Sequence, residues 1–385
     1  MQNFEFHNPT RIIFGGQSTG AINNLVPVDA RVLILSGGHS AERNGTLSEV
    51  RLALAGREIY EFSGIEANPT WETLSRAVAL ACDKRVSFLL AVGGGSVIDG
   101  TKFIAAAAKY SGHSWNILAD GGSSVTEALP FGVVLTLPAT GSEMNSAAVI
   151  TRKATKTKAV LQTPFVFPRF SILDPTRTYT LPARQLANGI VDAFVHVAEQ
   201  YLTWPVEARI QDRFAEGVMQ TLVEIGSKVV HEPAQYDSRA NLMWAAAMAL
   251  NGLIGAGVPQ DWTTHYIGHE LTALYEIDHG RTLAIILPSV MALYRDRKRE
   301  KLLQYASRIW GIAEGDENER IDLAIQQTRR FFESLGIKTR LSEYGLGQNA
   351  VNAVTEQLIK HDMTSLGEHQ SITPEQCRTI LEACI

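Results

Sequence analysis

Acidic and imidazole side chains recur in two short windows of the chain at spacings that favour metal binding. Asp192 and His196 lie four residues apart, and so do His265 and His269, which places each pair on one face of a helix. His279 follows, after the expected end of the second helix. One carboxylate with three imidazoles suits Fe²⁺ or Zn²⁺ better than Mg²⁺ or Ca²⁺. These five residues therefore predict a transition-metal site.

The residues around Asp192 and His196 are apolar, so both side chains are expected to point into the protein. A lone buried carboxylate is costly, and a bound cation would offset that cost. A purely structural Asp–His hydrogen bond explains this pair as well. His269-Glu270 begins like the zinc-protease motif H-E-x-x-H, but Ala273 stands where the second histidine is required.

Two glycine-rich turns follow apolar runs and are candidates for binding phosphate. Gly93-Gly94-Gly95-Ser96 follows the run 88–92 and precedes a helical stretch. Its glycines let backbone N–H groups approach an anion at the positive end of that helix. The turn matches neither the G-x-G-x-x-G fingerprint nor a Walker loop, and a tight turn without a ligand is the alternative.

The second turn, Ser36-Gly37-Gly38-His39-Ser40, follows the run 32–35. Rossmann-type folds often place an acid after this strand to bind the ribose 2′-hydroxyl, but none occurs here before Glu42. Small residues leave room for a 2′-phosphate, which Ser40 or Arg43 could bind. An ordinary loop explains the turn equally well.

The elements that must position these residues indicate two domains. Short apolar runs at 32–35, 88–92 and 133–137 alternate with helical stretches, which predicts a mainly parallel α/β sheet. Residues 112–130 are polar and are expected to form a loop. Helical periodicity dominates after Pro182, at residues 183–201, 209–230, 240–253, 261–276 and 321–335. We therefore expect an α/β dinucleotide-binding domain at 1–180 and an all-helical metal-binding and substrate domain at 181–385.

Composition excludes several other classes of protein. The chain has 385 residues, 45% of them hydrophobic, and a net charge of −5, so it can bury large cores and is not expected to be disordered or to bind nucleic acid. The basic run 295–301 is interrupted by acids, which favours a solvated helix face. Three cysteines cannot form a disulfide framework. No signal peptide or membrane-spanning run is evident, so we expect a cytoplasmic protein with no membrane partner.

Taken together, the motifs resemble those of the iron-containing, or group III, alcohol dehydrogenases, and the resemblance covers nearly the whole chain. Within that family the chain is similar to the NADP(H)-dependent aldehyde reductases and butanol dehydrogenases. The motifs that match are Gly93-Gly94-Gly95-Ser96-x-x-Asp99, Leu137-Pro138-Ala139-Thr140-Gly141-Ser142-Glu143, Asn188-Gly189-x-x-Asp192-x-x-x-His196, His265-x-x-x-His269 and Asp278-His279.

The resemblance implies a dehydroquinate synthase-like fold with an α/β N-terminal domain, an all-α C-terminal domain and the site in the cleft between them. It implies metal ligands at Asp192, His196, His265 and His279. His269 matches a family histidine that lies near the nicotinamide and is not a ligand, which makes it the candidate catalytic residue.

The resemblance also implies an NADP(H) cofactor and a homodimer. The residues that match family contacts to the dinucleotide are Gly37, Gly38, Ser40, Asn68, Gly94, Gly95, Ser96, Asp99, Thr136, Thr140, Ser142 and Lys158. The small Gly37 replaces the acid that selects NAD. The chain departs from its subgroup at Ala41-Glu42-Arg43, where a pair of lysines often helps to hold the 2′-phosphate.

The expected function is a metal-dependent, NADP(H)-linked alcohol dehydrogenase that mainly reduces short- to medium-chain aldehydes, with small molecules as its partners. The alternative is a lyase or phosphosugar dehydrogenase on the same architecture. Such an enzyme needs basic residues to hold a phosphate or carboxylate, whereas the windows 252–260 and 262–276 hold no lysine or arginine. A metal hydrolase would not need the glycine turns, and a non-catalytic nucleotide-binding module would not need the buried ligands.

Overall fold

The computed structural model describes residues 1–385, which form two compact units. The sheet unit consists of His7–Leu181 with Ala234–Ala247. The helical unit consists of Met1–Phe6, Pro182–Pro233 and Met248–Ile385. These units differ from the expected ranges 1–180 and 181–385 in two segments, since the N-terminal residues join the helical unit and residues 234–247 join the sheet unit. The functional division between the two ranges stays a prediction.

The sheet unit is built on a six-stranded parallel sheet with the strand order β1-β8-β5-β4-β2-β3. The six strands are β1 (Arg11–Phe14), β2 (Arg31–Ser36), β3 (Glu58–Phe62), β4 (Phe88–Gly94), β5 (Phe131–Leu137) and β8 (Phe170–Leu173). Strands β6 (Ala147–Arg152) and β7 (Thr157–Gln162) form a separate antiparallel hairpin. The predicted parallel α/β sheet is confirmed.

Continuous apolar runs form the central strands because both faces of the sheet are buried. Val32 and Ile34 of β2 pack with Leu90 of β4 in one core cluster, beneath residues of α1 (Ile22–Leu25) and α3 (Thr46–Ala53). Leu33, Leu35 and Ala91 are equally buried but point to the opposite face, since side chains alternate along a strand.

The order of the strands marks one place at which a ligand is expected. The chain runs from β2 outward to β3 and then returns to β4 on the other side of β2. In open α/β sheets, ligands bind beyond the carboxyl ends of the strands at such a reversal. The turns that follow β2 and β4 therefore lie at the favoured edge. Both are glycine-rich.

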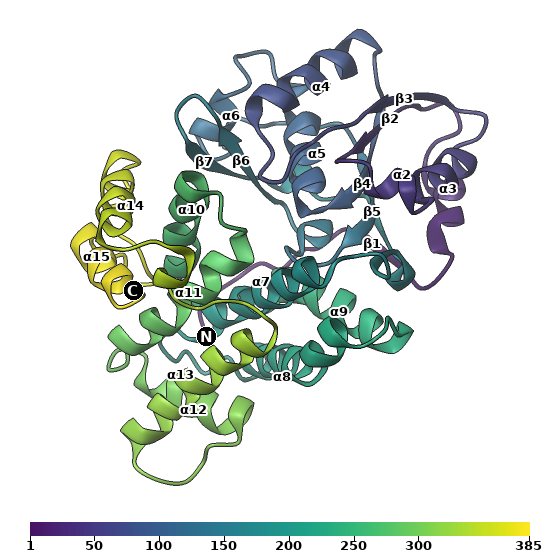
Figure 1. Ribbon diagram of the computed structural model, residues 1–385. Helices are drawn as coiled ribbons and strands as arrows, with labels where there is room; N and C mark the ends of the chain where they lie inside the picture. Colours follow the sequence, from purple (N-terminus) through teal and green to yellow (C-terminus); the bar gives the residue numbers. More distant parts are fainter. The chain divides into compact units, whose positions relative to one another are not determined.

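Short and long helices cover the sheet (Figure 1). Besides α1 and α3, the helices of the sheet unit are α2 (Ser40–Arg43), α4 (Trp71–Asp83), α5 (Gly95–Ala107), α6 (Asn116–Ala119) and most of α9 (Tyr236–Ala249). Thr70 caps α4 by accepting a hydrogen bond from Thr73 N. The stretch 112–130, expected to be a loop, contains the single turn α6.

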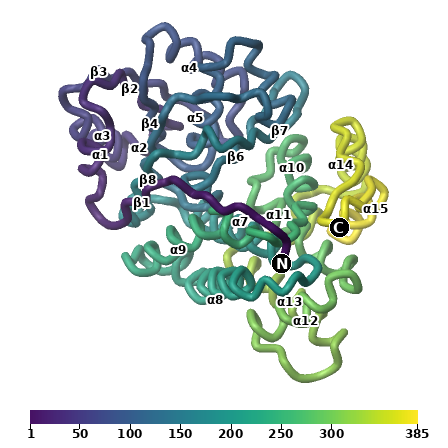
Figure 2. The backbone as a smooth tube through the Cα atoms, turned by 180° about the vertical axis from the view of Figure 1, so that it is seen from behind, coloured from purple at the N-terminus to yellow at the C-terminus, as the bar shows by residue number.

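The helical unit contains no strand among the described residues. Its helices are α7 (Ala183–Tyr201), α8 (Arg209–His231), α10 (Thr263–Tyr275), α11 (His279–Leu293), α12 (Arg299–Trp310), α13 (Glu317–Ser334), α14 (Gln348–Lys360) and α15 (Pro374–Glu382). The N-terminal end lies beside these helices (Figure 2), where Gln2 N donates to Gly257 O at 2.9 Å.

The long helices match their predictions closely, and the differences are local. Helix α7 has the predicted bounds 183–201, whereas α9 begins and ends four residues before the predicted range 240–253. Helices α11 and α14 were not expected. The first turn of α11 contains Gly280 and its interior contains Pro288, both of which lower local helix propensity.

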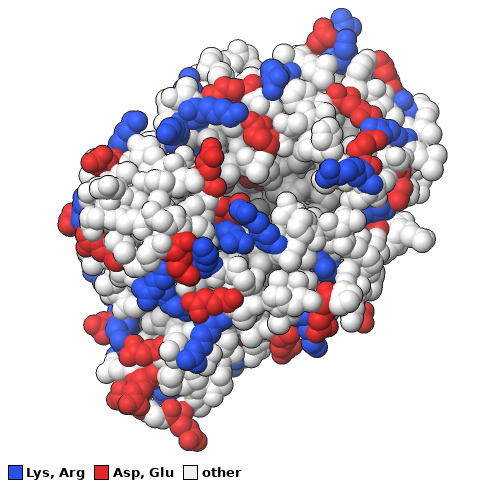
Figure 3. Space-filling view, in the orientation of Figure 1, with Lys and Arg blue, Asp and Glu red and all other residues white.

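Positive and negative side chains are interspersed over the face shown in Figure 3. The expectation that the basic run 295–301 forms a solvated face is wrong in part, because Lys298 and Lys301 are buried. Lys298 Nζ lies 2.8 Å from Asp261 Oδ2 and 2.7 Å from Glu368 Oε1. Lys301 Nζ lies 2.5 Å from Asp212 Oδ1, so both buried lysines of this run are paired, which offsets the cost of burying their charge. None of the helices combines the length and the hydropathy that crossing a bilayer requires.

Candidate functional site

Three helices of the helical unit bring the predicted metal ligands together. Asp192 lies in the middle of α7, His265 lies in the first turn of α10, and His279 is the first residue of α11. One possible ligand atom from each of these residues lies within 4.8 Å of the others. His279 Nε2 is 3.8 Å from Asp192 Oδ1. Ligands at zinc-like bond lengths stand roughly 3.4 Å apart in a tetrahedron, so this set fits a divalent cation after small adjustments.

His196, the fourth predicted ligand, lies beside this set but is not one of its members. Its ring stacks on that of His265 with centroids 4.6 Å apart, and its Nδ1 is 3.8 Å from Asp192 Oδ1. This buried Nδ1 has no hydrogen-bond partner. Burial lowers the pKa of His196 to about 4, so the neutral ring keeps a lone pair for a cation. Its role as a ligand stays a prediction.

His269 lies one turn along α10 from His265 and is buried. Its ring centroid is 5.1 Å from that of His279 and 6.4 Å from that of His265. It does not belong to the three-residue ligand set. It therefore borders the candidate metal centre, and its catalytic role stays a prediction.

Glu199 is a residue of this site that the sequence analysis missed. Its buried carboxylate accepts hydrogen bonds from Thr264 N at 2.6 Å and His265 N at 3.3 Å, and it also contacts His265 Nδ1. Because Nδ1 faces the carboxylate, Nε2 of His265 is the ring nitrogen that can offer a lone pair to a cation at the candidate metal centre. The available signal was spacing, since Glu199 follows Asp192 by seven residues on the same face of α7.

Replacing Glu199 with glutamine is expected to weaken metal binding by about 10- to 100-fold, the range typical for loss of an outer partner of a metal-bound histidine. The amide oxygen of glutamine can still accept a hydrogen bond from one backbone N–H. Its NH₂ group, however, would face an N–H of His265, and two donors cannot form a hydrogen bond. Competition with a chromophoric chelator measures the affinity. Glu224→Gln, an exposed glutamate on α8, is the matched control. Wild-type affinity in the Glu199 variant would contradict this role.

Hydrogen bonds of Asp278 and the close packing of two helix backbones hold His279 near Asp192. Asp278 Oδ2 accepts hydrogen bonds from Arg184 Nε and Asn188 Nδ2, each at 2.7 Å, and so joins the start of α11 to α7. A β-carbon at Gly280 would lie 2.4 Å from Asn188 O and 3.0 Å from Asn188 Cα. Only glycine permits the two helices to approach this closely, and that approach brings His279 to Asp192.

Most of the cofactor residues predicted in the sheet unit lie at one edge of the parallel sheet. The registers Ser36↔Val92 and Gly94↔Leu137 show that β2, β4 and β5 end side by side. The turns beyond them contain, or directly adjoin, most of the predicted dinucleotide contacts, which are Gly37, Gly38, Ser40, Gly94, Gly95, Ser96, Thr136, Thr140 and Ser142. Asn68 and Lys158 lie elsewhere in the unit and are joined by a hydrogen bond of 2.9 Å.

Two glycines of the turn after β4 are required by the packing of the chain itself. A β-carbon at Gly95 would lie 2.4 Å from Thr140 Oγ1, and one at Gly93 would lie 2.5 Å from Val97 Cγ2. The turn is therefore tight whether or not a phosphate binds. The following helix α5 has thirteen residues, so its N-terminus also offers an anion the unpaired N–H groups and the dipole.

A buried polar cluster that the sequence analysis missed supports the turn after β5. Lys102 is fully buried in α5, and its Nζ donates to Ser142 Oγ at 2.8 Å, Asn145 Oδ1 at 2.7 Å and Ala147 O at 2.7 Å. Ser142 Oγ in turn donates to Asp99 Oδ1 at 2.6 Å. Asp99 and Ser142, both predicted to contact the dinucleotide, are thus bonded to each other.

Glu143 in the same cluster is fully buried, and neither of its carboxyl oxygens has a hydrogen-bond partner. Burial raises the pKa of Glu143 to about 7. Below about pH 4.5 the carboxyl is protonated in both the folded and unfolded states. As pH rises from there to about 7, only the unfolded chain releases this proton, so the free energy of unfolding falls.

Glu143→Gln is therefore expected to stabilise the protein against urea at pH 8 by up to about 3 kcal/mol, with little gain at pH 4.5. Urea titrations of both proteins at the two pH values measure the difference. Glu127→Gln, at an exposed site of the same unit, controls for the loss of charge. An equal effect at both pH values would contradict the assigned ionisation.

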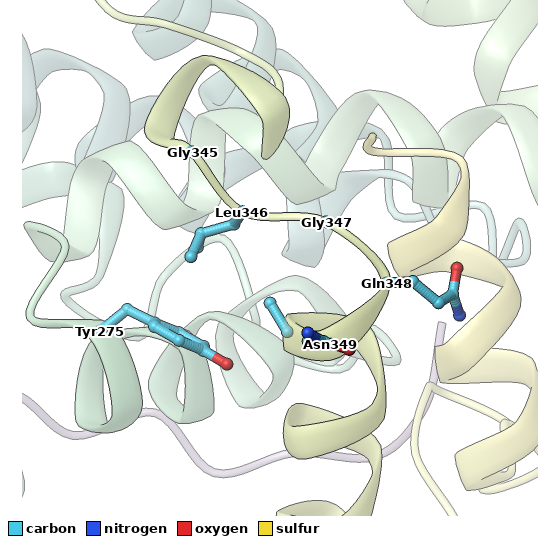
Figure 4. Close-up of a pocket in the computed structure, with 7 residues that line it drawn as sticks. Tyr275, Gly345, Leu346, Gly347, Gln348 and Asn349 are labelled. Carbon is cyan, nitrogen blue, oxygen red and sulfur yellow. The ribbon is translucent and has the colours of Figure 1, made fainter.

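A separate cavity of about 310 Å³ lies between the end of α10 and the start of α14 (Figure 4). Its lining residues are Tyr275, Gly345, Leu346, Gly347, Gln348, Asn349 and Ala350, none of which is charged. Tyr275 follows His265 by ten residues on α10, which is about 15 Å along a helix. The cavity therefore lies at the opposite end of α10 from His265.

The regions that match known proteins cover almost the whole chain. Residues 9–175 match the family model of iron-containing alcohol dehydrogenase, and residues 186–385 match the C-terminal model of the same family. The chain is 57% identical to the NADPH-dependent aldehyde reductase YqhD of Escherichia coli, with all of both chains covered. It is 38% identical, again over the full length of both, to a probable NADH-dependent butanol dehydrogenase of Bacillus subtilis.

Solved structures agree with these relationships. The crystal structure of E. coli YqhD superposes with a TM-score of 0.98 at 56% identity, covering 100% of this chain and 99% of that one. An NADH-dependent butanol dehydrogenase from Thermotoga maritima gives a TM-score of 0.95 at 35% identity, with the same coverage. The fold and both family models lead to one conclusion: the chain belongs to the iron-containing alcohol dehydrogenase family.

Proposed function

We propose that the protein is a metal-dependent, NADP(H)-linked alcohol dehydrogenase that acts mainly as a reductase of short- to medium-chain aldehydes. The observation that carries this proposal is the convergence of Asp192, His265 and His279 in a family of alcohol dehydrogenases. The 57% identical relative is named as an NADPH-dependent aldehyde reductase, which favours NADPH and the direction of reduction. The lyase or phosphosugar dehydrogenase alternative is not favoured.

The proposed ligands are Asp192, His196, His265 and His279, and the proposed ion is Fe²⁺ or Zn²⁺. A divalent cation held there supplies a Lewis acid that polarises a carbonyl oxygen. Glu199 orients the ring of His265, while the Asp278 contacts and Gly280 hold His279 against α7. These residues fix the donor atoms before substrate arrives, which limits reorganisation during the reaction.

The proposed cofactor contacts are the residues at the edge of the sheet described above, together with Asn68, Asp99 and Lys158. The turn after β4 and the N-terminus of α5 suit the pyrophosphate, and Gly37 with Ser40 suits the ribose and its 2′-phosphate. We place the catalytic His269 near the nicotinamide. A proton reaches the product oxygen from water, from the ribose hydroxyl or from His269.

A bound nicotinamide would supply the hydride for an aldehyde carbon, so the stoichiometry of the reaction tests the proposed function. Incubation with NADPH and butanal is expected to give one 1-butanol for each NADPH oxidised, with absorbance and gas chromatography as the two readouts. Turnover with NADH is expected to be lower. NADPH consumption without butanol would contradict the proposal, and so would butanol formation without nucleotide.

The proposed setting of the enzyme is the cytoplasm, as expected from the sequence, and its proposed assembly is a homodimer. The homodimer rests on the family resemblance. The mass in solution, measured by light scattering at several protein concentrations, tests the dimer.

A further inference from the structure

An ion-pair cluster lies directly beyond the turn that follows β2. Arg51 of α3 donates to Glu42 of α2 through Nη1 at 3.0 Å and Nη2 at 2.9 Å. The same guanidinium donates to Glu61 of β3 through Nε at 2.7 Å and Nη2 at 2.9 Å. One arginine thus holds two carboxylates, each with a two-pronged contact.

This cluster is stronger than an ordinary surface ion pair. Its side chains are partly exposed, at 37% for Arg51, 49% for Glu42 and 41% for Glu61, and isolated pairs of that kind contribute little. Paired N–H groups on each carboxylate add geometric definition, which is the circumstance in which arginine is effective. The hydrogen bond from Arg51 lowers the pKa of Glu42, so this acid is charged at neutral pH.

The position of Glu42 connects this ion-pair cluster to cofactor binding. Glu42 follows Ser40 by two residues, in the segment where doubly wound folds distinguish a ribose 2′-hydroxyl from a 2′-phosphate. An unpaired carboxylate here would repel a 2′-phosphate. Arg51 neutralises Glu42 and also draws Glu61 to the same guanidinium.

The charges of four ionic side chains of α2, α3 and β3 show what depends on Arg51. Glu42 and Glu61 both pair with Arg51, whereas Arg43 is exposed and forms no ion pair. The set of Glu42, Arg43, Arg51 and Glu61 is neutral overall, with Arg43 left to attract a phosphate. Removing Arg51 would leave two acids against one arginine at this turn.

We propose that Arg51 is a positioning residue that determines cofactor specificity: by holding Glu42 and Glu61, it makes the turn after β2 acceptable to a 2′-phosphate. This inference rests on the proposed use of NADP(H). It explains how an acid at position 42, where the subgroup often has lysine, is compatible with NADPH. Arg51 acts through the two acids and need not touch the nucleotide.

Direct binding separates this role from catalysis. NADPH and NADH are titrated by their fluorescence, without aldehyde, against wild type, Arg51→Gln, Glu42→Gln and the double variant. Arg51→Gln is expected to bind NADPH about tenfold more weakly while its affinity for NADH stays within about twofold, because only NADPH has the extra phosphate charge. The double variant is expected to recover most of the NADPH affinity.

Salt and a matched control sharpen the test. Raising NaCl from about 0.05 M to 0.5 M is expected to shrink the NADPH deficit of Arg51→Gln, since added ions screen exposed charges. Arg209→Gln removes the same charge from an exposed ion pair in the helical unit and is expected to leave both affinities unchanged. Adenosine 2′,5′-bisphosphate, used as a second probe, should bind the variants in the same order of affinity as NADPH does.

The inference is overturned if Arg51→Gln keeps the wild-type preference, loses NADPH and NADH equally, or is not rescued by Glu42→Gln. It is also overturned if wild type binds NADPH no better than NADH. A wild type that prefers NADPH but reduces no aldehyde would instead contradict the proposed function and leave the role of Arg51 intact.

Discussion

Replacing His265 with alanine is expected to remove the bound metal and the aldehyde reductase activity together. His265 contributes a donor to the cluster with Asp192 and His279, and Glu199 fixes its ring. Loss of a direct ligand should weaken metal binding by more than about 100-fold, the upper range for loss of an outer partner. Turnover should fall by at least about 1,000-fold, because a Lewis acid contributes several kcal/mol to the barrier.

Metal content by mass spectrometry after gel filtration and NADPH oxidation with butanal are the two measurements. A third readout is thermal unfolding with and without chelator, since a ligand that binds only the folded state raises the midpoint. Wild type should lose stability on chelation, whereas the variant should not respond. His7→Ala, an exposed histidine of the sheet unit, is the control. Full metal occupancy and turnover in the His265 variant would show that the ligand assignment is wrong.

Gly280→Ala is expected to destabilise the helical unit and to weaken metal binding, although residue 280 contacts no metal. The added β-carbon would meet the backbone of Asn188 at 2.4 Å, and no side-chain rotation can relieve that contact. Helix α11 must therefore move away from α7 and take His279 with it. Overpacking of this kind costs about 1–3 kcal/mol or more.

Thermal unfolding and chelator competition measure the two effects of Gly280→Ala. The unfolding midpoint should fall by several degrees, and metal affinity should fall by about tenfold or more. Gly217→Ala is a matched control in α8, where a β-carbon meets nothing within 4 Å, and it should be neutral or slightly stabilising. An unchanged midpoint and affinity for Gly280→Ala would refute the packing argument.

The sequence predicted the long helices and the central strands because their patterns are strong over many residues. Helix α7 shows its apolar face over nineteen residues, and β4 is an uninterrupted apolar run before its glycines. Strands β1 and β8, with four residues each, escaped detection, and so did the partly exposed strands β3, β6 and β7. Helix α11 was missed because Gly280 and Pro288 disfavour a helix locally, while its packing against α7 and α10 favours it.

The candidate metal centre was predictable in its residue types but not in the residues that hold them in place. The i, i+4 spacings on α7 and α10 and the nearby His279 predicted a donor cluster, and the structure assembles Asp192, His265 and His279. Glu199 was missed because a glutamate in a helix is ordinarily solvated, and its partner His265 lies in another helix. Lys298 was misread for the same reason, since Asp261 and Glu368 are distant in sequence.

At the edge of the sheet with the predicted cofactor contacts, the sequence likewise showed the residue types but not their supporting contacts. The glycine turns after β2 and β4 were visible as residue types, but the ion pairs of Arg51 with Glu42 and Glu61 depend on how α2, α3 and β3 pack. Lys102 reads as an interruption of an apolar helix, and only the fold shows its three acceptors around Ser142. Long-range pairing of charges is set by tertiary structure and not by local pattern.

The most direct test of the central claim is the initial rate of NADPH oxidation with butanal, before and after chelation and after addition of Fe²⁺ or Zn²⁺. NADH under the same conditions provides the comparison. We expect rapid oxidation of NADPH in preference to NADH, loss of activity on chelation, and recovery with at least one of the two ions. Oxidation that persists after the metal has been fully removed, or no oxidation with the metal bound, would contradict it.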